Sequence, residues 1–167
     1  MTLDINDKAA VEKLLWGEIE ESRFGMLACG TPSGGHFQPM TAFAEPESGT
    51  IWFYGRTDTE LAKSAGTATP AVFVFMSKDQ KVQASISGQL HAGPDLLHRD
   101  KYWSAMVGAW FAKGKGDPHL TMLSFTCGEA NVWVSDKGGL KLGWEVAKAN
   151  LTGSTPDVGG HATLKLG

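Results

Sequence analysis

Cysteine is scarce in this sequence of 167 residues, and its scarcity argues against several classes of small protein. The only two, Cys29 and Cys127, lie far apart in apolar segments, with no CxxC motif and no Cys/His cluster. A disulfide framework or a structural zinc site needs such spacings. We interpret both cysteines as buried, reduced thiols, with a disulfide or a metal site as the alternative, and we expect a cytoplasmic protein.

Blocks of like charge and long apolar runs are missing as well. The 15 basic residues are scattered among 18 acidic ones, for a net charge of −3, whereas non-specific nucleic-acid binding needs clustered Lys and Arg. No apolar run approaches the roughly 20 residues of a membrane span, and the acidic, polar start of the chain is not typical of a signal peptide. We therefore expect neither a nucleic acid nor a membrane as a partner.

Familiar catalytic motifs are also absent. The sequence has no G-x-G-x-x-G after a strand, no Walker loop, no H-E-x-x-H and no G-x-S-x-G. Its five histidines are dispersed, with no pair at the spacing of metal ligands. Catalysis by a metal ion or by a nucleophilic triad is therefore unsupported.

The sequence does have the apolar residues, 42% of the total, that a core requires, and its length fits one domain over residues 1–167. Its 21 glycines are scattered at turn-like places, and six tryptophans are many for this length. Large aromatic side chains often stay partly exposed where they bind a ligand or another subunit.

The order of apolar patterns predicts a mainly β fold with flanking helices. Near the N-terminus, Val11, Leu15 and Ile19 recur at helical spacing. The predicted helices are 6–22, 58–65, 94–106 and 144–151, and the predicted strands are 24–29, 36–45, 50–55, 71–77, 82–92, 121–127 and 130–136. Because short turns join most strands, we expect an antiparallel barrel rather than a parallel α/β sheet.

Glycine and proline predict further details of these strands. Pro39 indicates an edge strand or a bulge, and Gly88 indicates a bulge or a sharp bend. The continuous apolar run 71–77 predicts a strand that is buried on both faces. The last two strands are predicted to form a hairpin around Gly128, and residues 31–35 are predicted to form a turn.

The start of the second helix is one of two places compatible with a ligand. Thr57 and Glu60 have capping-box spacing, and Gly66 stands where a C-terminal cap would be. Free N–H groups there, together with Arg56, Thr57 and Lys63, suit a phosphate. Because Glu60 opposes an anion, an ordinary capped helix is the favoured interpretation from these residues alone.

The second place is the extended segment 38–43 beside the aromatic residues 52–54. Backbone groups next to an aromatic strand could hold a planar heterocycle. From these residues alone, the core of a barrel is the favoured interpretation.

Taken in their order, the segments SRFGMLAC, QPMT, IWFYG, TPAVFVFM, SISGQL, GAW and GDP resemble the FMN-binding split β-barrel superfamily. Within it, the chain is most similar to the general stress protein 26 branch of the pyridoxamine 5'-phosphate oxidase-like proteins, over nearly its whole length. The resemblance implies a six-stranded antiparallel split β-barrel and a homodimer with two FMN sites across its interface.

The resemblance also implies residues that contact the cofactor. The stretch 38–41 matches the strand along the flavin ring, and Phe53 and Tyr54 match the next strand that contacts it. With the two residues at the start of the second helix, the candidate cofactor-binding residues are Gln38, Pro39, Met40, Thr41, Phe53, Tyr54, Arg56, Thr57, Lys63, Gln83, Trp110 and Trp133.

Four of these candidates have a specific role in the resemblance. Lys63 matches a lysine that binds the flavin phosphate, and Gln83 matches a glutamine that bonds the flavin ring in the oxidases. Trp110 belongs to a G-A-W segment whose following residues come from the partner subunit. Trp133 resembles a tryptophan near the cofactor from that same partner.

The sequence departs from the family pattern in three places. Gln38 stands where relatives usually have Arg, which removes a candidate phosphate contact, and Gly55 stands where they often have a Thr hydroxyl. The oxidases end in an Arg/His-rich segment that binds pyridoxal phosphate, whereas this chain ends without an arginine. We therefore expect vitamin B6 oxidase activity to be absent or very weak, and we assign no catalytic side chain.

The leading hypothesis is an FMN-dependent oxidoreductase related to stress response, in which the flavin performs the redox chemistry and the substrate lies near Trp110 and Trp133. The alternative is a non-catalytic module that stores or senses flavin, which the lack of a substrate-anchoring cluster favours. FAD or riboflavin in place of FMN stays open. So does a haem or a deazaflavin, with His36, His91 and His161 as the candidate haem ligands.

Overall fold

The computed structural model describes residues 3–30, 36–135, 139–155 and 159–167, which leaves the predicted turn at 31–35 outside the described residues. The helices are α1 (Lys8–Ser22), α2 (Glu60–Ser64), α3 (Leu96–Tyr102), α4 (Ala105–Gly108) and α5 (Gly139–Thr152), with short 3-10 turns at Pro46–Ser48 and Gly114–Gly116. The strands are β1 (Phe24–Cys29), β2 (Gln38–Thr41), β3 (Phe43–Glu45), β4 (Thr50–Arg56), β5 (Thr69–Met76), β6 (Val82–Gly93), β7 (Leu120–Val134) and β8 (Gly160–Lys165).

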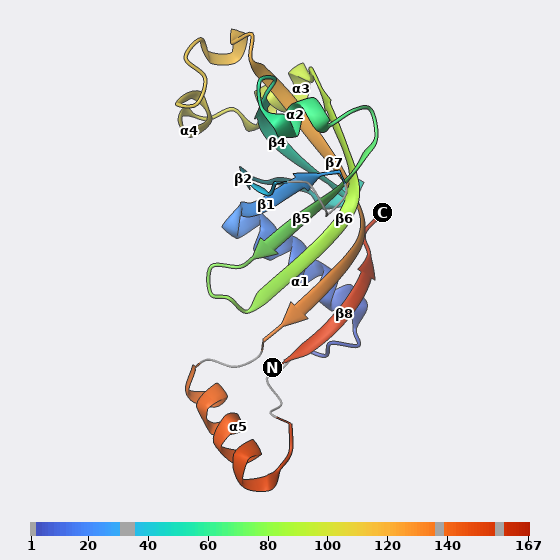
Figure 1. Cartoon of the computed structure of the whole chain (residues 1–167), viewed down its shortest axis with the longest axis vertical. Helices are drawn as coiled ribbons and strands as arrows, with labels where there is room; N and C mark the ends of the chain where they lie inside the picture. Colours follow the sequence, from blue (N-terminus) through green and yellow to red (C-terminus); the bar gives the residue numbers. More distant parts are fainter. Residues whose placement is uncertain (1–2, 31–35, 136–138, 156–158) are drawn as a thin grey trace.

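The strands close into a barrel through one kinked strand. Every strand pair is antiparallel, in the order β2-β1-β5-β6-β7-β4-β3, and β8 pairs with β7 outside this path. Only Ala42 separates β2, which pairs with β1, from β3, which pairs with β4. If β2 and β3 count as one strand, the ring has the six strands that the resemblance implies, and β8 is additional. The prediction of a mainly β, antiparallel split barrel is confirmed (Figure 1).

Helix α1 packs against β3, β6 and β8 and contributes to the core. Asp7 caps it by accepting a hydrogen bond from the N–H of Ala10, so the helix begins two residues later than predicted. Val11, Leu15 and Ile19, which the sequence placed on one face, are fully buried. Inside the barrel the largest fully buried side chains are Phe53, Phe73, Phe75 and Phe125.

The predicted hairpin around Gly128 is wrong, because β7 is one continuous strand from Leu120 to Val134. The carbonyl of Gly128 accepts a hydrogen bond from the N–H of Leu166, and a Cβ on Gly128 would lie 3.1 Å from the carbonyl oxygen of Ser87. The glycine therefore permits a close backbone approach rather than a turn. The bulge predicted at Gly88 is confirmed by a register shift between Ile86 and Gly88.

Four other predictions about local structure are corrected. Strand β5 is not buried on both faces, since Met76 is 55% exposed. Helix α2 is capped by Thr59 rather than Thr57, and its C-cap is Ala65 rather than Gly66, because Thr59 is the residue whose hydroxyl reaches the N–H of Ala62. The predicted helix 94–106 is two helices, α3 and α4, and β8 follows α5 in a segment for which no strand was predicted.

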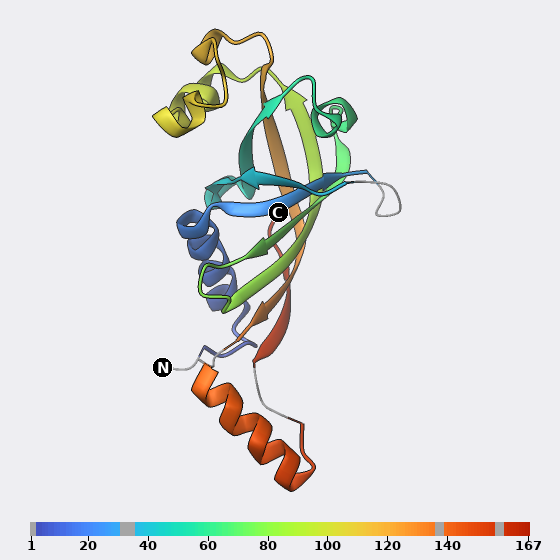
Figure 2. The same ribbon diagram turned by 60° about the vertical axis from the view of Figure 1, so that its left-hand side comes forward.

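Helix α5 projects from the lower end of the barrel, between β7 and β8 (Figures 1 and 2). It begins earlier than the predicted 144–151. In the described part of the chain, no helix combines the length and the apolar character needed to cross a membrane. The same residues contain no group of three or more metal-binding side chains.

Pro39 lies in β2, which is at one end of the strand order. This agrees with the edge strand that the proline predicted.

Candidate functional site

One surface of the sheet carries side chains that point away from the core. Side chains alternate along a strand, so Phe24 and Met26 of β1 face outwards while Leu27 is fully buried. The register places Met26 opposite Pro39 of β2 and also opposite Val74 of β5. Outward-facing side chains of three strands therefore lie side by side.

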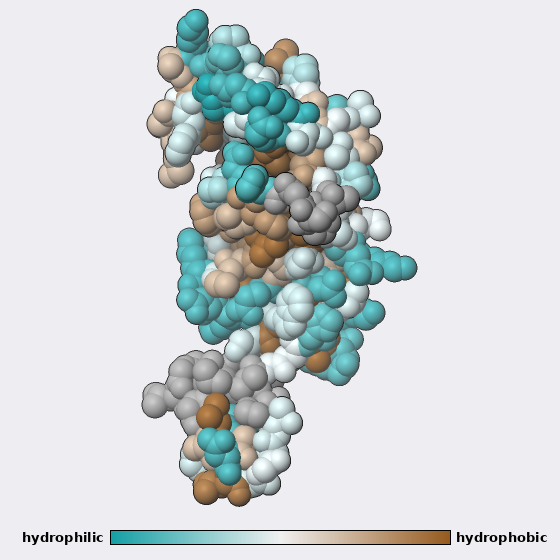
Figure 3. Space-filling view, in the orientation of Figure 1, coloured by the Kyte–Doolittle hydropathy of each residue, from teal (hydrophilic) through white to brown (hydrophobic). Residues whose placement is uncertain are grey.

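The same surface continues across two more strands. Gln83 of β6 lies opposite Met76 of β5 on one side and opposite Trp133 of β7 on the other. We call this outward surface of β2, β1, β5, β6 and β7 the outer face. Figure 3 shows hydrophobic residues gathered on this face, over β1 and β5.

A groove of about 530 Å³ lies on the outer face, within the roughly 300–1,000 Å³ usual for ligand pockets. Its apolar lining comes mainly from Phe24, Met26, Val74, Met76 and Trp133, and its polar lining includes Lys78, Gln83 and Ser85. Several of the apolar side chains are about half exposed, Phe24 at 59% and Trp133 at 46%. An apolar wall with an indole and the side-chain amides of Gln80 and Gln83 suits a planar, polycyclic ligand, so these residues fit the ring of the flavin that the resemblance implies.

Four of the candidate residues lie on the outer face. Gln83 and Trp133 line the groove itself, and the Gln83 amide donates a hydrogen bond to the backbone carbonyl of Gln80. Pro39 and Thr41 are exposed on the neighbouring strand β2, where Thr41 lies opposite Phe24.

Four other candidates have side chains elsewhere. Met40 and Phe53 are 7% and 0% exposed in the core, so only their backbone could reach a ligand on the outer face. The half-buried Gln38 places its amide nitrogen 3.6 Å from the sulfur of Met40. Tyr54 donates a hydrogen bond to the carbonyl of Arg99, and burial, followed by the charge of Asp100, raises the pKa of Tyr54 to about 12.

The candidate phosphate residues at the end of β4 and in α2 already have partners. Arg56 binds both carboxylate oxygens of Asp58, at 3.0 and 2.8 Å. The Lys63 ammonium lies 3.3 Å from the carboxylate of Glu60 and its side chain is 57% exposed. Thr57 contributes its backbone N–H to the carbonyl of His119. The local charge is therefore balanced rather than strongly positive.

Trp110 is far from the groove within one chain. It is 76% exposed and follows α4 at the upper end of the molecule, whereas Trp133 lies near the end of β7, which points to the lower end (Figure 1). Within one chain, Trp133 lines the groove and Trp110 does not.

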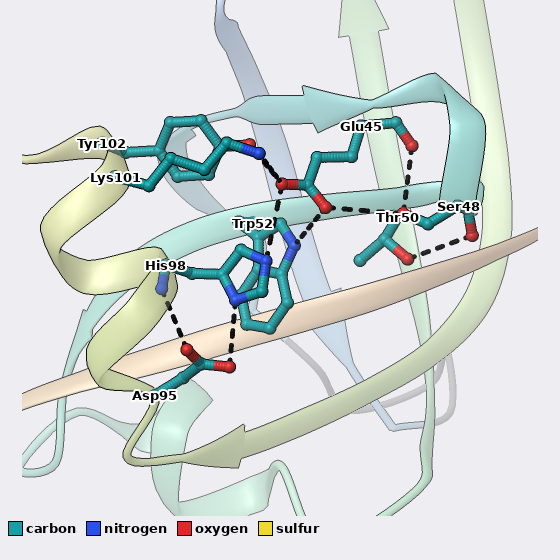
Figure 4. A network of polar contacts seen from close by, with 8 residues as sticks. All are labelled: Glu45, Ser48, Thr50, Trp52, Asp95, His98, Lys101 and Tyr102. Atoms are coloured by element: carbon teal, nitrogen blue, oxygen red, sulfur yellow. Dashed lines mark hydrogen bonds and ion pairs between the residues drawn. The ribbon is translucent and has the colours of Figure 1, made fainter.

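A polar network that was not predicted from the sequence links α3 to β3 and β4 (Figure 4). The carboxylate of Glu45 accepts hydrogen bonds from Lys101 at 2.5 Å, Tyr102 at 2.6 Å and the indole N–H of Trp52 at 3.2 Å. Burial raises the pKa of Glu45, but these three hydrogen bonds outweigh burial and hold the pKa at about 2.

His98 lies at the centre of the same network. Its ring stacks on Trp52 with centroids 3.7 Å apart, and its two nitrogens lie 3.0 Å from Asp95 and 3.5 Å from Glu45. Both ring nitrogens thus face carboxylates, and the network links α3 to β3 and β4. The spacing of His98, Lys101 and Tyr102 on one helix face could be read from the sequence, but the position of Glu45 opposite them could not.

The fold is that of a split-barrel protein, and comparison with known families and structures agrees with it. The sequence model of the family described as pyridoxamine 5'-phosphate oxidase like matches residues 10–157. The chain belongs to this family. No functionally curated protein matches it.

Solved structures give the same relationship. A candidate general stress protein 26 from Jannaschia sp. CCS1 is 34% identical, covers 94% of this chain and 99% of its own, and has a TM-score of 0.77. The general stress FMN/FAD binding protein from Xanthomonas citri is 32% identical, covers 78% of this chain and 92% of its own, and has a TM-score of 0.71. A relative of general stress protein 26 from Clostridium acetobutylicum, 15% identical with a TM-score of 0.64, shows the fold alone.

Proposed function

We propose that the protein binds FMN in the groove of the outer face and acts as an FMN-dependent oxidoreductase of the general stress type. The observation that carries this proposal is the position of Gln83 and Trp133. Both are candidates from the sequence resemblance alone, and they lie side by side in an apolar groove of suitable size. A related protein from Xanthomonas citri is an FMN/FAD binding protein, so FAD stays an alternative ligand.

The groove accounts for the ring of the cofactor. Trp133 and Met76 offer apolar surface to the ring, and the Gln83 amide would exchange its bond to the backbone for one to a polar edge of the ring. The flavin, when bound, supplies the redox chemistry. The residues of the chain bind it, orient it and keep water from one of its faces.

A homodimer is part of the proposal, and the incomplete burial of this groove supports it. A ligand of this size usually has about 70–90% of its surface buried, whereas Phe24, Met76 and Trp133 stay about half exposed in one chain. A second copy can cover the groove and bring its own Trp110 to the site, which one chain cannot do. A two-fold dimer then has two equivalent sites.

The groove also supports the alternative of a flavin-binding module without catalysis. Among the described residues, Lys78 is the one charged side chain in its lining, so an anionic substrate has a single anchor. The proposed enzyme would reduce an acceptor with electrons from a donor such as NAD(P)H, and the module would not.

Titration of the purified protein with FMN, followed by flavin fluorescence and by the mass of the complex, tests the proposal. We expect one flavin per chain and a dimeric mass, with steady-state oxidation of NAD(P)H in the presence of an acceptor. Saturable binding without turnover supports the non-catalytic module. Absence of binding by FMN, FAD and riboflavin overturns the flavin proposal, and a haem or deazaflavin spectrum in the purified protein would replace it.

A further inference from the structure

The outer side of Trp133 is covered by a residue from β8, a strand that the sequence did not predict. The register places His161 opposite Trp133, and the centroids of the two rings are 4.9 Å apart with an angle of 34° between their planes. Trp133 thus stands between two neighbours. Gln83 lies beside it on β6, in the groove, and His161 lies beside it on β8.

The imidazole of His161 is itself held in place. Its Nε2 atom lies 3.1 Å from the side-chain oxygen of Asn131, which also accepts a hydrogen bond of 3.1 Å from the hydroxyl of Thr163. Because an amide oxygen only accepts, Nε2 carries the hydrogen in this contact. The three residues lie on the strands β7 and β8 next to Trp133, so they form a fixed edge beside a half-exposed indole.

We infer that His161 is a positioning residue that, supported by Asn131, holds the indole of Trp133 as one wall of the ligand groove. The inference rests on the proposed flavin site. An exposed tryptophan on a strand has more than one accessible rotamer, and a wall for a planar ligand needs one of them. The ring of His161 packs against the side of the indole and so favours the rotamer that faces the groove.

A double-mutant cycle with Trp133 tests this inference. We expect His161→Ala to weaken FMN binding about two- to twelvefold, the range that a lost aromatic pair of about 0.5–1.5 kcal/mol corresponds to. In the Trp133→Ala background the same substitution should change the affinity by less than a factor of two, since the effect passes through Trp133. His161→Phe should restore most of the affinity because a ring again packs on the indole.

His91→Ala is the matched control, since His91 is an exposed histidine of β6 whose ring contacts the carbonyl of Gly66 rather than the groove. The affinity of the His91→Ala protein for FMN should equal that of the wild type. Equal losses from His161→Ala with and without Trp133 would overturn the inference, because they would show that His161 acts independently.

A measurement without flavin separates this inference from the proposed function. Acrylamide quenching of tryptophan fluorescence in the apoprotein should increase with His161→Ala and should not change when Trp133 is already Phe. If FMN fails to bind the wild type, the proposed function is wrong, and so is the assignment of His161 and Trp133 to a ligand wall. If FMN binds but His161→Ala leaves both affinity and quenching unchanged, the positioning role alone is wrong.

Discussion

At the scale of single residues, the two cations assigned to the flavin phosphate are each paired with a carboxylate. Lys63 lies on the surface beside Glu60, and surface ion pairs of this kind contribute about 0–1 kcal/mol. A phosphate dianion can therefore displace Glu60 at little cost, whereas the two-bond contact of Arg56 with Asp58 is harder to replace. Neither cation lines the groove of its own chain, and of the two, Lys63 is the one more available to a ligand.

We predict that Lys63→Ala weakens FMN binding about tenfold or more and leaves riboflavin binding unchanged. A hydrogen bond to a charged group contributes about 1.5–3 kcal/mol, and only FMN carries the phosphate. Lys13→Ala, on the exposed face of α1, is the control and should alter neither affinity. Equal losses for FMN and riboflavin would refute the assignment of Lys63 to the phosphate.

Glu45 makes the stability of the fold depend on pH. Its pKa is about 2 in the folded chain, below its ordinary value of 4.5, so the carboxylate stabilises the folded state fully above about pH 4.5 and loses this contribution as the pH falls towards 2. We expect Glu45→Gln to destabilise the protein by about 2 kcal/mol at pH 7, a discounted value because Lys101 is 53% exposed. Urea unfolding from pH 7 to pH 3 should show the difference from wild type shrinking.

The control for this experiment is Glu47→Gln, which changes an exposed carboxylate two residues away. Its unfolding free energy should follow the wild type at each pH. A constant gap between Glu45→Gln and wild type from pH 7 to pH 3 would contradict the role assigned to the charge of Glu45.

At the scale of elements, glycines in β6 and β7 permit close approach of backbones. A Cβ on Gly88 would lie 2.2 Å from the carbonyl oxygen of Thr126 and 2.8 Å from the ring of Phe125. We predict that Gly88→Ala lowers the free energy of unfolding by about 1–3 kcal/mol, the usual effect of overpacking. Gly17→Ala, in α1 with no atom within 4 Å of its Cβ, should raise it by about 0.5–1 kcal/mol. If thermal unfolding showed that Gly88→Ala is more stable than the wild type, the bulge would have space for a methyl group and the prediction would be wrong.

These glycines also explain which elements the sequence could predict. The apolar run of β1, the alternation of side chains in β6 and the periodicity of α1 are local, and all three elements agree with the prediction to within two residues at each end. A glycine in a strand and a glycine in a hairpin turn look the same locally. The distinction at Gly128 depends on its neighbours Ser87 and Leu166, so β7 could not be recognised as one strand.

At the scale of the whole molecule, the site follows from the register of the barrel rather than from one motif. The family resemblance supplied Gln83 and Trp133, and antiparallel pairing of β6 with β7 brings them together. Glu45 was not predicted as a site residue, because its partners on α3 are more than 50 positions away along the chain. His161 was named only as a candidate haem ligand, because its contact with Asn131 spans 30 positions. Trp110 and Trp133 lie at opposite ends of one chain (Figure 1), which supports the proposal that a complete site needs two copies.

The central claim is that the groove beside Trp133 binds the flavin, and one comparison tests it most directly. FMN is titrated into the wild type, Trp133→Ala and Trp144→Ala, with flavin fluorescence as the signal. Trp144 is an equally large aromatic, 69% exposed, on the projecting helix α5. We predict that Trp133→Ala loses about tenfold or more in affinity, because it removes the largest apolar wall of the groove, and that Trp144→Ala binds as the wild type does. Tight, unchanged binding by Trp133→Ala would contradict the account and place the flavin elsewhere.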